Sequence, residues 1–103
     1  MLEYKINIKM RDNLVSIITP CYNCSKYIGQ MIESIMAQTY PHWELLITDD
    51  CSTDNSRDIV QSYCEIDPRV KLFVLEKNSG AGVARNKSIE EAKGTTEDRG
   101  EYQ

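Results

Sequence analysis

Three short runs of apolar residues, each followed by a polar loop and a helical periodicity, organise this chain. The runs are Leu14–Thr19 (LVSIIT), Trp43–Thr48 (WELLIT) and Val70–Leu75 (VKLFVL). They are nearly continuous and mostly rich in β-branched residues, which is typical of strands buried on both faces of a parallel sheet. The alternation of strand and helix predicts an α/β domain made of right-handed βαβ units, which is half of a doubly wound fold.

The helices are predicted from apolar positions that recur every three or four residues. Asn23 or Ser25 is expected to cap the first helix, Asp54 or Ser56 to cap the second, and Gly94 to close the third. The apolar faces are Ile28, Met31, Ile32, Ile35 and Met36 in the first helix, Ile59, Val60, Tyr63 and Ile66 in the second, and Val83, Ala84, Ile89 and Ala92 in the third.

The chain divides into three parts. Residues 1–13 form an N-terminal extension in which Tyr4, Ile6, Ile8 and Met10 alternate with polar residues, which indicates an extra strand. Residues 14–94 contain the βα units. Residues 95–103 (TTEDRGEYQ) have little apolar content, so this tail is expected to be unstructured.

Composition narrows the classes of function. The net charge of -4 and the lack of a Lys/Arg cluster disfavour binding to nucleic acid or to an anionic membrane. The apolar runs are too short to span a bilayer, and the N-terminus lacks the continuous apolar stretch of a secretory signal. A cytoplasmic protein is expected, and its four cysteines are therefore predicted to be thiols.

The predicted topology also fixes where a ligand would bind. Ligands of open parallel sheets bind beyond the carboxyl ends of the strands, which here are followed by the loops Pro20–Ser25, Asp49–Asn55 and Asn78–Arg85. These loops supply an aromatic ring, two carboxylates with hydroxyls, and two glycines followed by a cation, a set that suits a nucleotide. The same residue types are common in ordinary turns and helix caps, and composition alone favours that structural interpretation over a nucleotide site.

Longer motifs favour the nucleotide. The strings SIITPCYN, QTYPHWELLITDDCSTDNS and KNSGAGVARNKSIEEAKG occur in this order between Leu14 and Gly94. They resemble the opening, nucleotide-binding part of family 2 glycosyltransferases of the GT-A type. The resemblance implies a Rossmann-like half domain with a parallel sheet of about three strands in the order 3-2-1. It also implies transfer of a sugar from a nucleotide-sugar, of UDP type, to an acceptor hydroxyl in polysaccharide biosynthesis.

Carried over position by position, the resemblance implies a base pocket. Asp50 would accept a base N–H, Arg85 would lie near the base and the diphosphate, and Asp49 would order its own loop. Cys51 stands where the family often has glycine, which costs little unless the backbone there needs a positive φ. The nucleotide-binding positions so implied are Pro20, Tyr22, Asn23, Asp50, Ser52 and Arg85, of which the first three would form the wall around the base.

The resemblance ends before the catalytic parts of the family. There, a fourth strand typically ends in a D-x-D motif that holds Mn²⁺ or Mg²⁺ on the donor diphosphate, and a later acidic residue acts as the base. Glu97, Asp98 and Glu101 follow no apolar strand, so we predict no catalytic residue and no metal ligand here. This truncated GT-A fold is expected to be inactive alone, and the glycan acceptor of an inverting transfer would bind through the missing half.

Without the fourth strand, Leu14–Thr19 would form an apolar sheet edge. An unpaired edge of this kind invites pairing. We therefore expect it to be covered by Tyr4–Met10 or by a second chain, and hence expect either an additional N-terminal strand or an oligomer.

Two other classes of function compete. Cys21 and Cys24 form a C-x-x-C between a strand and a helix, as in thioredoxin-like oxidoreductases, although no later proline faces the motif before a sheet strand. Cys21, Cys24 and Cys51 would also lie at neighbouring strand ends, as zinc ligands could. No second C-x-x-C exists, and the simpler interpretation is that these thiols are small, semi-buried side chains.

Overall fold

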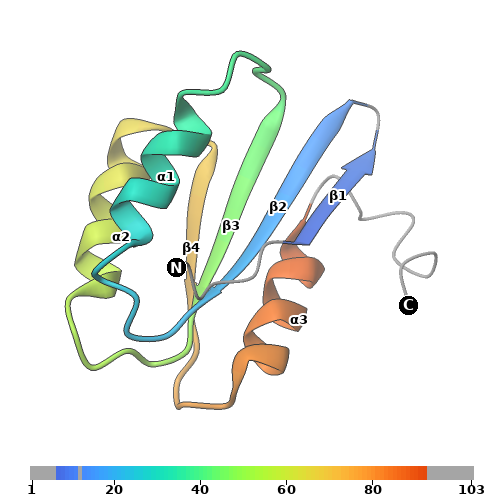
Figure 1. The fold of residues 1–103 in the computed structure, drawn as a ribbon. Coiled ribbons are helices and arrows are strands. Elements are labelled where there is room, and N and C mark those ends of the chain that lie inside the picture. Colours follow the sequence, from blue (N-terminus) through green and yellow to red (C-terminus); the bar gives the residue numbers. More distant parts are fainter. Residues whose placement is uncertain (1–6, 12, 93–103) are drawn as a thin grey trace.

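A computed structural model describes residues 7–11 and 13–92, which form one sheet with helices on both faces (Figure 1). Its strand order is β1-β2-β3-β4. Strands β2, β3 and β4 are parallel, whereas β1 is antiparallel to β2. The predicted α/β class and the 3-2-1 order of the parallel strands are confirmed. The strands are β1 (Asn7–Arg11), β2 (Leu14–Cys21), β3 (Trp43–Asp49) and β4 (Val70–Val74).

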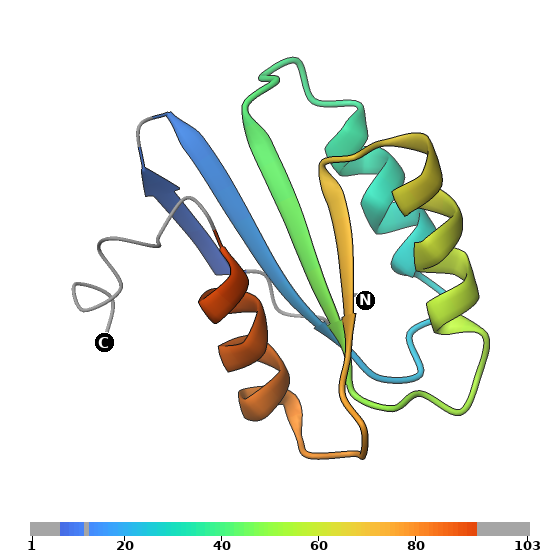
Figure 2. The same ribbon diagram turned by 180° about the vertical axis from the view of Figure 1, so that it is seen from behind.

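Three helices connect and cover the strands: α1 (Ile28–Met36), α2 (Ser56–Ile66) and α3 (Ala81–Glu91). Figures 1 and 2 show α1 and α2 together on one face of the sheet and α3 on the other. None of the helices that the structure describes is long and apolar enough to cross a membrane.

The predicted cap of the first helix is wrong. α1 begins at Ile28 with Tyr27 as its N-cap, and no side chain caps it. The residues before it form a separate turn, in which the backbone N–H groups of Tyr27 and Ile28 both donate to the carbonyl of Cys24. Asn23 cannot start a helix here because its φ is 50°, in the left-handed region.

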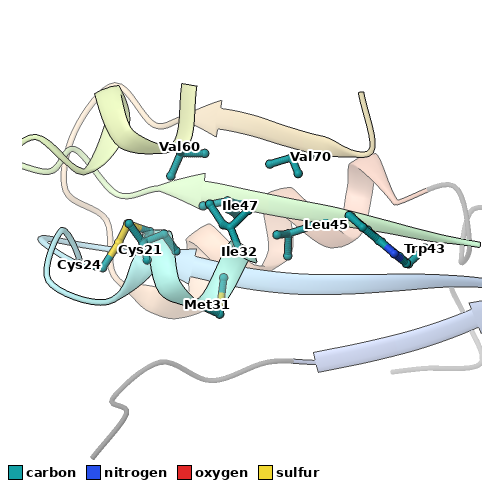
Figure 3. Close-up of a cluster of buried hydrophobic side chains, with 10 residues drawn as sticks. Cys21, Cys24, Met31, Ile32, Trp43, Leu45, Ile47, Val60 and Val70 are labelled. Atoms are coloured by element: carbon teal, nitrogen blue, oxygen red, sulfur yellow. A yellow bond between two sulfur atoms is a disulfide. The ribbon is translucent and has the colours of Figure 1, made fainter. Parts of the chain in front are cut away.

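Side chains alternate between the two faces of the sheet and build two core clusters. The larger cluster lies under α1 and α2 (Figure 3), and the smaller joins Ile18 and Leu46 to Ala92 under α3. Every residue of β3 is buried, as expected for the strand that has a parallel neighbour on each side. The buried members of the larger cluster are Cys21, Cys24, Ile28, Met31, Ile32, Trp43, Leu45, Ile47, Val60 and Val70.

Strand β2 runs through Pro20 to Cys21, beyond its predicted end at Thr19. Alternate residues of a strand direct their N–H groups to opposite neighbours, and the Val15 N–H donates toward the β3 side, to His42. The nitrogen of Pro20 therefore faces the β1 side. Among the described residues, the β1 ladder pairs with β2 as far as Ile18, so the proline lies beyond the described part of that ladder and removes no donor from it.

The edge of β2 is paired within the chain. β1 lies along it from the pair Arg11↔Leu14 to the pair Asn7↔Ile18. This strand satisfies the backbone groups of that stretch, which removes the physical reason for expecting an oligomer there. Predictions that concern residues 1–6 and 93–103, including the closing glycine of the third helix, the tail and its three acidic residues, lie outside the described residues.

Candidate functional site

The loops that follow β2, β3 and β4 lie together at the carboxyl edge of the sheet, at the lower end of Figure 1. Backbone hydrogen bonds hold the loops side by side where they leave the strands. The Asp50 N–H donates to the Cys21 carbonyl at 2.8 Å, and the Leu75 N–H donates to the Asp49 carbonyl at 2.9 Å. The second loop is therefore tied to both of its neighbours.

Asp50 is the link between the second and third loops. Its side chain is buried, with the residue 3% exposed. One carboxylate oxygen accepts the Ser79 N–H at 2.6 Å and the other accepts the Gly80 N–H at 2.8 Å. Gly80, at φ 98°, precedes the first residue of α3, so Asp50 fixes the entry into that helix. Each oxygen keeps a further lone pair for another donor.

Asp49 orders the second loop itself. It is 1% exposed, and its two oxygens accept the Ser52 hydroxyl at 2.5 Å and the Ser52 N–H at 2.9 Å. Arg57, from the first turn of α2, lies 3.6 Å from the same carboxylate and compensates its charge. This is the ordering role expected for Asp49.

Asn23 and Ser52 are brought together and join the first loop to the second. The Asn23 N–H donates to the Ser52 hydroxyl oxygen at 2.9 Å. In return, the Asn23 amide oxygen accepts the Thr53 N–H at 2.8 Å and the Asp54 N–H at 3.3 Å. Hence the amide oxygen of Asn23, expected to contribute to the base wall, faces the second loop.

Asp54 and Ser56 add a second set of hydrogen bonds between these loops. Neither residue is among the nucleotide-binding positions predicted from the sequence. The Cys24 N–H donates to the Ser56 hydroxyl oxygen at 2.8 Å, and the Ser25 N–H donates to Asp54 at 3.3 Å. Asp54 also accepts the Ser56 N–H at 2.9 Å, at the start of α2. The predicted cap of the second helix is also wrong, because α2 begins at Ser56 with Asn55 as its N-cap, whose side chain makes no capping bond, while the Asp54 and Ser56 side chains accept N–H groups of the first loop.

These bonds control the acidity of Asp54. Partial burial acts to raise its pKa, but hydrogen bonds from Ser56 and Ser25 outweigh this and lower the pKa from 3.8 to about 2. Because the folded-state pKa is depressed, the stabilisation is present above pH 3.8 and is lost as the pH falls toward about 2.

The expected result is a steeper loss of stability on acidification in the wild-type protein than in Asp54→Asn. Urea unfolding at several pH values between 6 and 2 measures the free energy of unfolding of both proteins. All other carboxylates are the same in the two proteins, so their contributions cancel in the comparison. A free-energy difference between the two that is independent of pH would contradict the assigned pKa.

The remaining predicted site residues, Pro20, Tyr22 and Arg85, take no part in these side-chain hydrogen bonds. Tyr22, in the first loop, is 49% exposed, and Pro20 is half-buried near the end of β2. Arg85 is half-buried in α3, and its guanidinium makes no hydrogen bond or ion pair with another residue in the described ranges. Within residues 7–11 and 13–92, the Tyr22 ring and the Arg85 guanidinium are therefore not engaged by side-chain hydrogen bonds or ion pairs.

The prediction that all four cysteines are thiols is wrong for two of them. Cys21 and Cys24 form a disulfide, whereas Cys51 and Cys64 are free. The strand end and the following turn bring the paired residues to a Cα–Cα distance of 5.8 Å, which suits a disulfide. Both are buried, at 2% and 1% exposure, whereas a C-x-x-C that exchanges disulfides rapidly with other proteins is partly exposed, which disfavours the oxidoreductase alternative. This bond can exchange with an external thiol only when the first loop opens.

Cys51 occupies a backbone position that favours glycine. Its φ is 62°, so the condition under which this residue would be costly is met. In the described part of the chain, its thiol makes a single long contact, 3.9 Å, with the Glu76 carbonyl.

We expect Cys51→Gly to raise the free energy of unfolding by about 0.5–1 kcal/mol, because relief of the left-handed strain exceeds the added entropy of the unfolded chain. Chemical denaturation measures the change, and Cys51→Ala, which keeps the β-carbon, is the control. A glycine variant no more stable than the alanine variant would contradict the strain.

The carboxylates at this edge do not fit a metal ion. No group of three His, Cys, Asp or Glu residues that could hold one occurs among residues 13–92. Asp49 and Asp50 already accept hydroxyl and backbone N–H donors.

Known proteins are similar to this chain in both sequence and fold. The family model described as Glycosyl transferase family 2 matches residues 16–96. The chain belongs to this family. One relative is the Bacillus subtilis protein described as putative teichuronic acid biosynthesis glycosyltransferase TuaG, which is 56% identical over 81 residues. That match covers 79% of this chain and 32% of TuaG, so the chain spans about a third of its relative's length.

Solved structures support the same fold. The S. aureus TarS fragment 1–349 in complex with UDP superimposes with a TM-score of 0.65 at 38% identity, over 73% of this chain and 23% of the other. The mannosyltransferase PcManGT from Pyrobaculum calidifontis, in complex with GDP-Man and Mn²⁺, gives a TM-score of 0.62 at 27% identity, over 72% and 23% respectively. The described strands and helices thus correspond to part of a GT-A domain.

Proposed function

We propose that this chain is the nucleotide-binding part of a glycosyltransferase that uses a UDP-type sugar donor. One observation carries the proposal: hydrogen bonds join the loops that follow β2, β3 and β4 into one rigid rim at the carboxyl edge of the sheet. Within the described residues, the side chains of Tyr22 and Arg85 make no such bonds and are available to a ligand. A preorganised rim of this kind lowers the entropic cost of binding. The similarity to TarS in complex with UDP favours uridine over other bases.

In the proposed pocket, each group has a physical role. The Tyr22 ring and Pro20 pack against the base, and a free lone pair of Asp50 accepts the uracil N–H. Arg85 supplies positive charge for the diphosphate. Asn23 and Ser52 position the wall by holding the first two loops together.

Titration of isotopically labelled protein with UDP, followed by NMR, tests the proposal. We expect saturable shifts for amides of the three loops and smaller effects with GDP or ADP, because a guanine or adenine base does not present the same N–H to Asp50. Absence of shifts at millimolar UDP, or shifts confined to other parts of the chain, would overturn it.

The chain alone is expected to transfer no sugar. Inverting transfer needs a group that stabilises the departing diphosphate and a base that takes the acceptor proton. Neither role can be given to Asp49 or Asp50, whose carboxylates hold the loops. Donor hydrolysis and transfer should stay at the no-enzyme rate with Mn²⁺ or Mg²⁺ present. Metal-dependent turnover would show that other residues complete the site.

A further inference from the structure

The Cys21–Cys24 disulfide lies inside the proposed nucleotide site. It closes a short ring that contains only Tyr22 and Asn23 between the bonded residues. Figure 3 shows the two cysteines within the larger core cluster, at the end of β2. The bond is therefore both part of the core and the covalent support of the exposed tyrosine.

Each end of this ring is held by other interactions. Cys21 is the last residue of β2 and pairs with Asp49 in the ladder, and its carbonyl accepts the Asp50 N–H. On the other side, the N–H groups of Asn23 and Cys24 donate to the second loop. Tyr22 has no such bond to another described residue, so it is the residue of the ring that can move.

Opening the bond needs space that the core does not have. Bonded sulfurs are about 2 Å apart, whereas unbonded heavy atoms pack at about 3.5–4 Å. Both cysteines are nearly fully buried in a close-packed cluster, so the two reduced sulfurs must separate by displacing their surroundings. Strand pairing holds Cys21, and hydrogen bonds to the second loop hold the N–H groups of Asn23 and Cys24. The backbone around Tyr22 must therefore move when the sulfurs separate.

We propose that the Cys21–Cys24 bond is a redox switch for the nucleotide site, with the oxidised chain as the tighter binder. This inference rests on the proposed function. A dithiol such as dithiothreitol supplies two electrons and two protons, the S–S bond breaks to give two thiols, and the reductant closes to its cyclic disulfide. Reduction should weaken UDP binding about three- to tenfold, because Tyr22 must then be ordered on binding.

The test compares UDP affinity of the oxidised, reduced and reoxidised chain by NMR titration. Thiol counting establishes each state: two of the four cysteines are free with the bond closed, and all four after reduction. We expect weaker binding after reduction and recovery after reoxidation. Cys51→Ser/Cys64→Ser, which keeps the bond, should show the same response. Cys21→Ala/Cys24→Ala should bind like the reduced chain and not respond to reductant.

The outcomes separate the two proposals. Equal UDP affinity in both redox states would overturn the switch and leave the proposed function intact. Failure of UDP to bind either state would overturn the proposed function and the switch with it. Four free thiols in protein purified without reductant would show that the bond does not form and would also overturn the switch. If the alanine double variant does not fold, the comparison of the oxidised and reduced wild-type chain still decides.

Discussion

Asp50→Ala is expected to destabilise the fold by about 2–3 kcal/mol and to abolish detectable UDP binding, because hydrogen bonds to a charged group contribute about 1.5–3 kcal/mol each and water replaces part of the loss. The variant loses both bonds that hold Ser79 and Gly80 at the start of α3. It also loses the proposed acceptor for the uracil N–H. Urea unfolding and a UDP titration measure the two effects separately.

Asp50→Asn is the matched control for that experiment. An asparagine oxygen can accept one of the two N–H groups, but its NH₂ group would face the other donor. We expect a smaller loss of stability than in the alanine variant, together with weakened UDP binding. An alanine variant as stable as the wild type would contradict the role of Asp50 as the link between the loops.

Ile47→Ala is expected to lower the free energy of unfolding by about 2–5 kcal/mol, since it removes three buried carbons from the central strand and leaves a cavity. Ile47 is fully buried in β3, in the cluster between the sheet and the α1–α2 layer. A loss of this size is a large share of the roughly 5–15 kcal/mol that stabilises a typical domain. Thermal and chemical unfolding measure it.

Two milder substitutions provide a scale for the loss of stability in Ile47→Ala. Ile47→Val should cost about 0.5–1.5 kcal/mol, and Val74→Ala, at the half-exposed end of β4, should cost less than the Ile47→Ala change. An effect of Ile47→Ala no larger than that of Val74→Ala would show that β3 is not the centre of the core.

The fold was predictable because the three apolar runs and the helical periodicities are local signals. Each run corresponds to one parallel strand, and the observed strand ends differ from the predicted ends by one or two residues. The runs are Leu14–Thr19, Trp43–Thr48 and Val70–Leu75. The strand extension through Pro20 was not predicted because it depends on pairing with β3, where Pro20 and Cys21 lie opposite Thr48 and Asp49, and such pairing is a tertiary property. The late start of α1 was missed for a related reason: Asn23 bonds to the second loop.

At the site, the sequence indicated which loops converge but not how their polar groups are shared. Asp49, Asp50 and Asp54 have similar local contexts, yet one orders its own loop, one links to the third loop and one links to the first. Only the three-dimensional arrangement separates these roles. The expected cytoplasmic setting favours thiols, whereas the close spacing of Cys21 and Cys24 allows the disulfide that the structure contains.

The central claim is that the carboxyl-edge rim holds a uridine nucleotide with its base against Tyr22. An isotope-filtered NOE experiment on the labelled, oxidised chain with unlabelled UDP tests it most directly. Cross-peaks are expected from the uracil H5 and H6 protons to the ring protons of Tyr22. Cross-peaks from the uracil only to residues away from the three loops would contradict it.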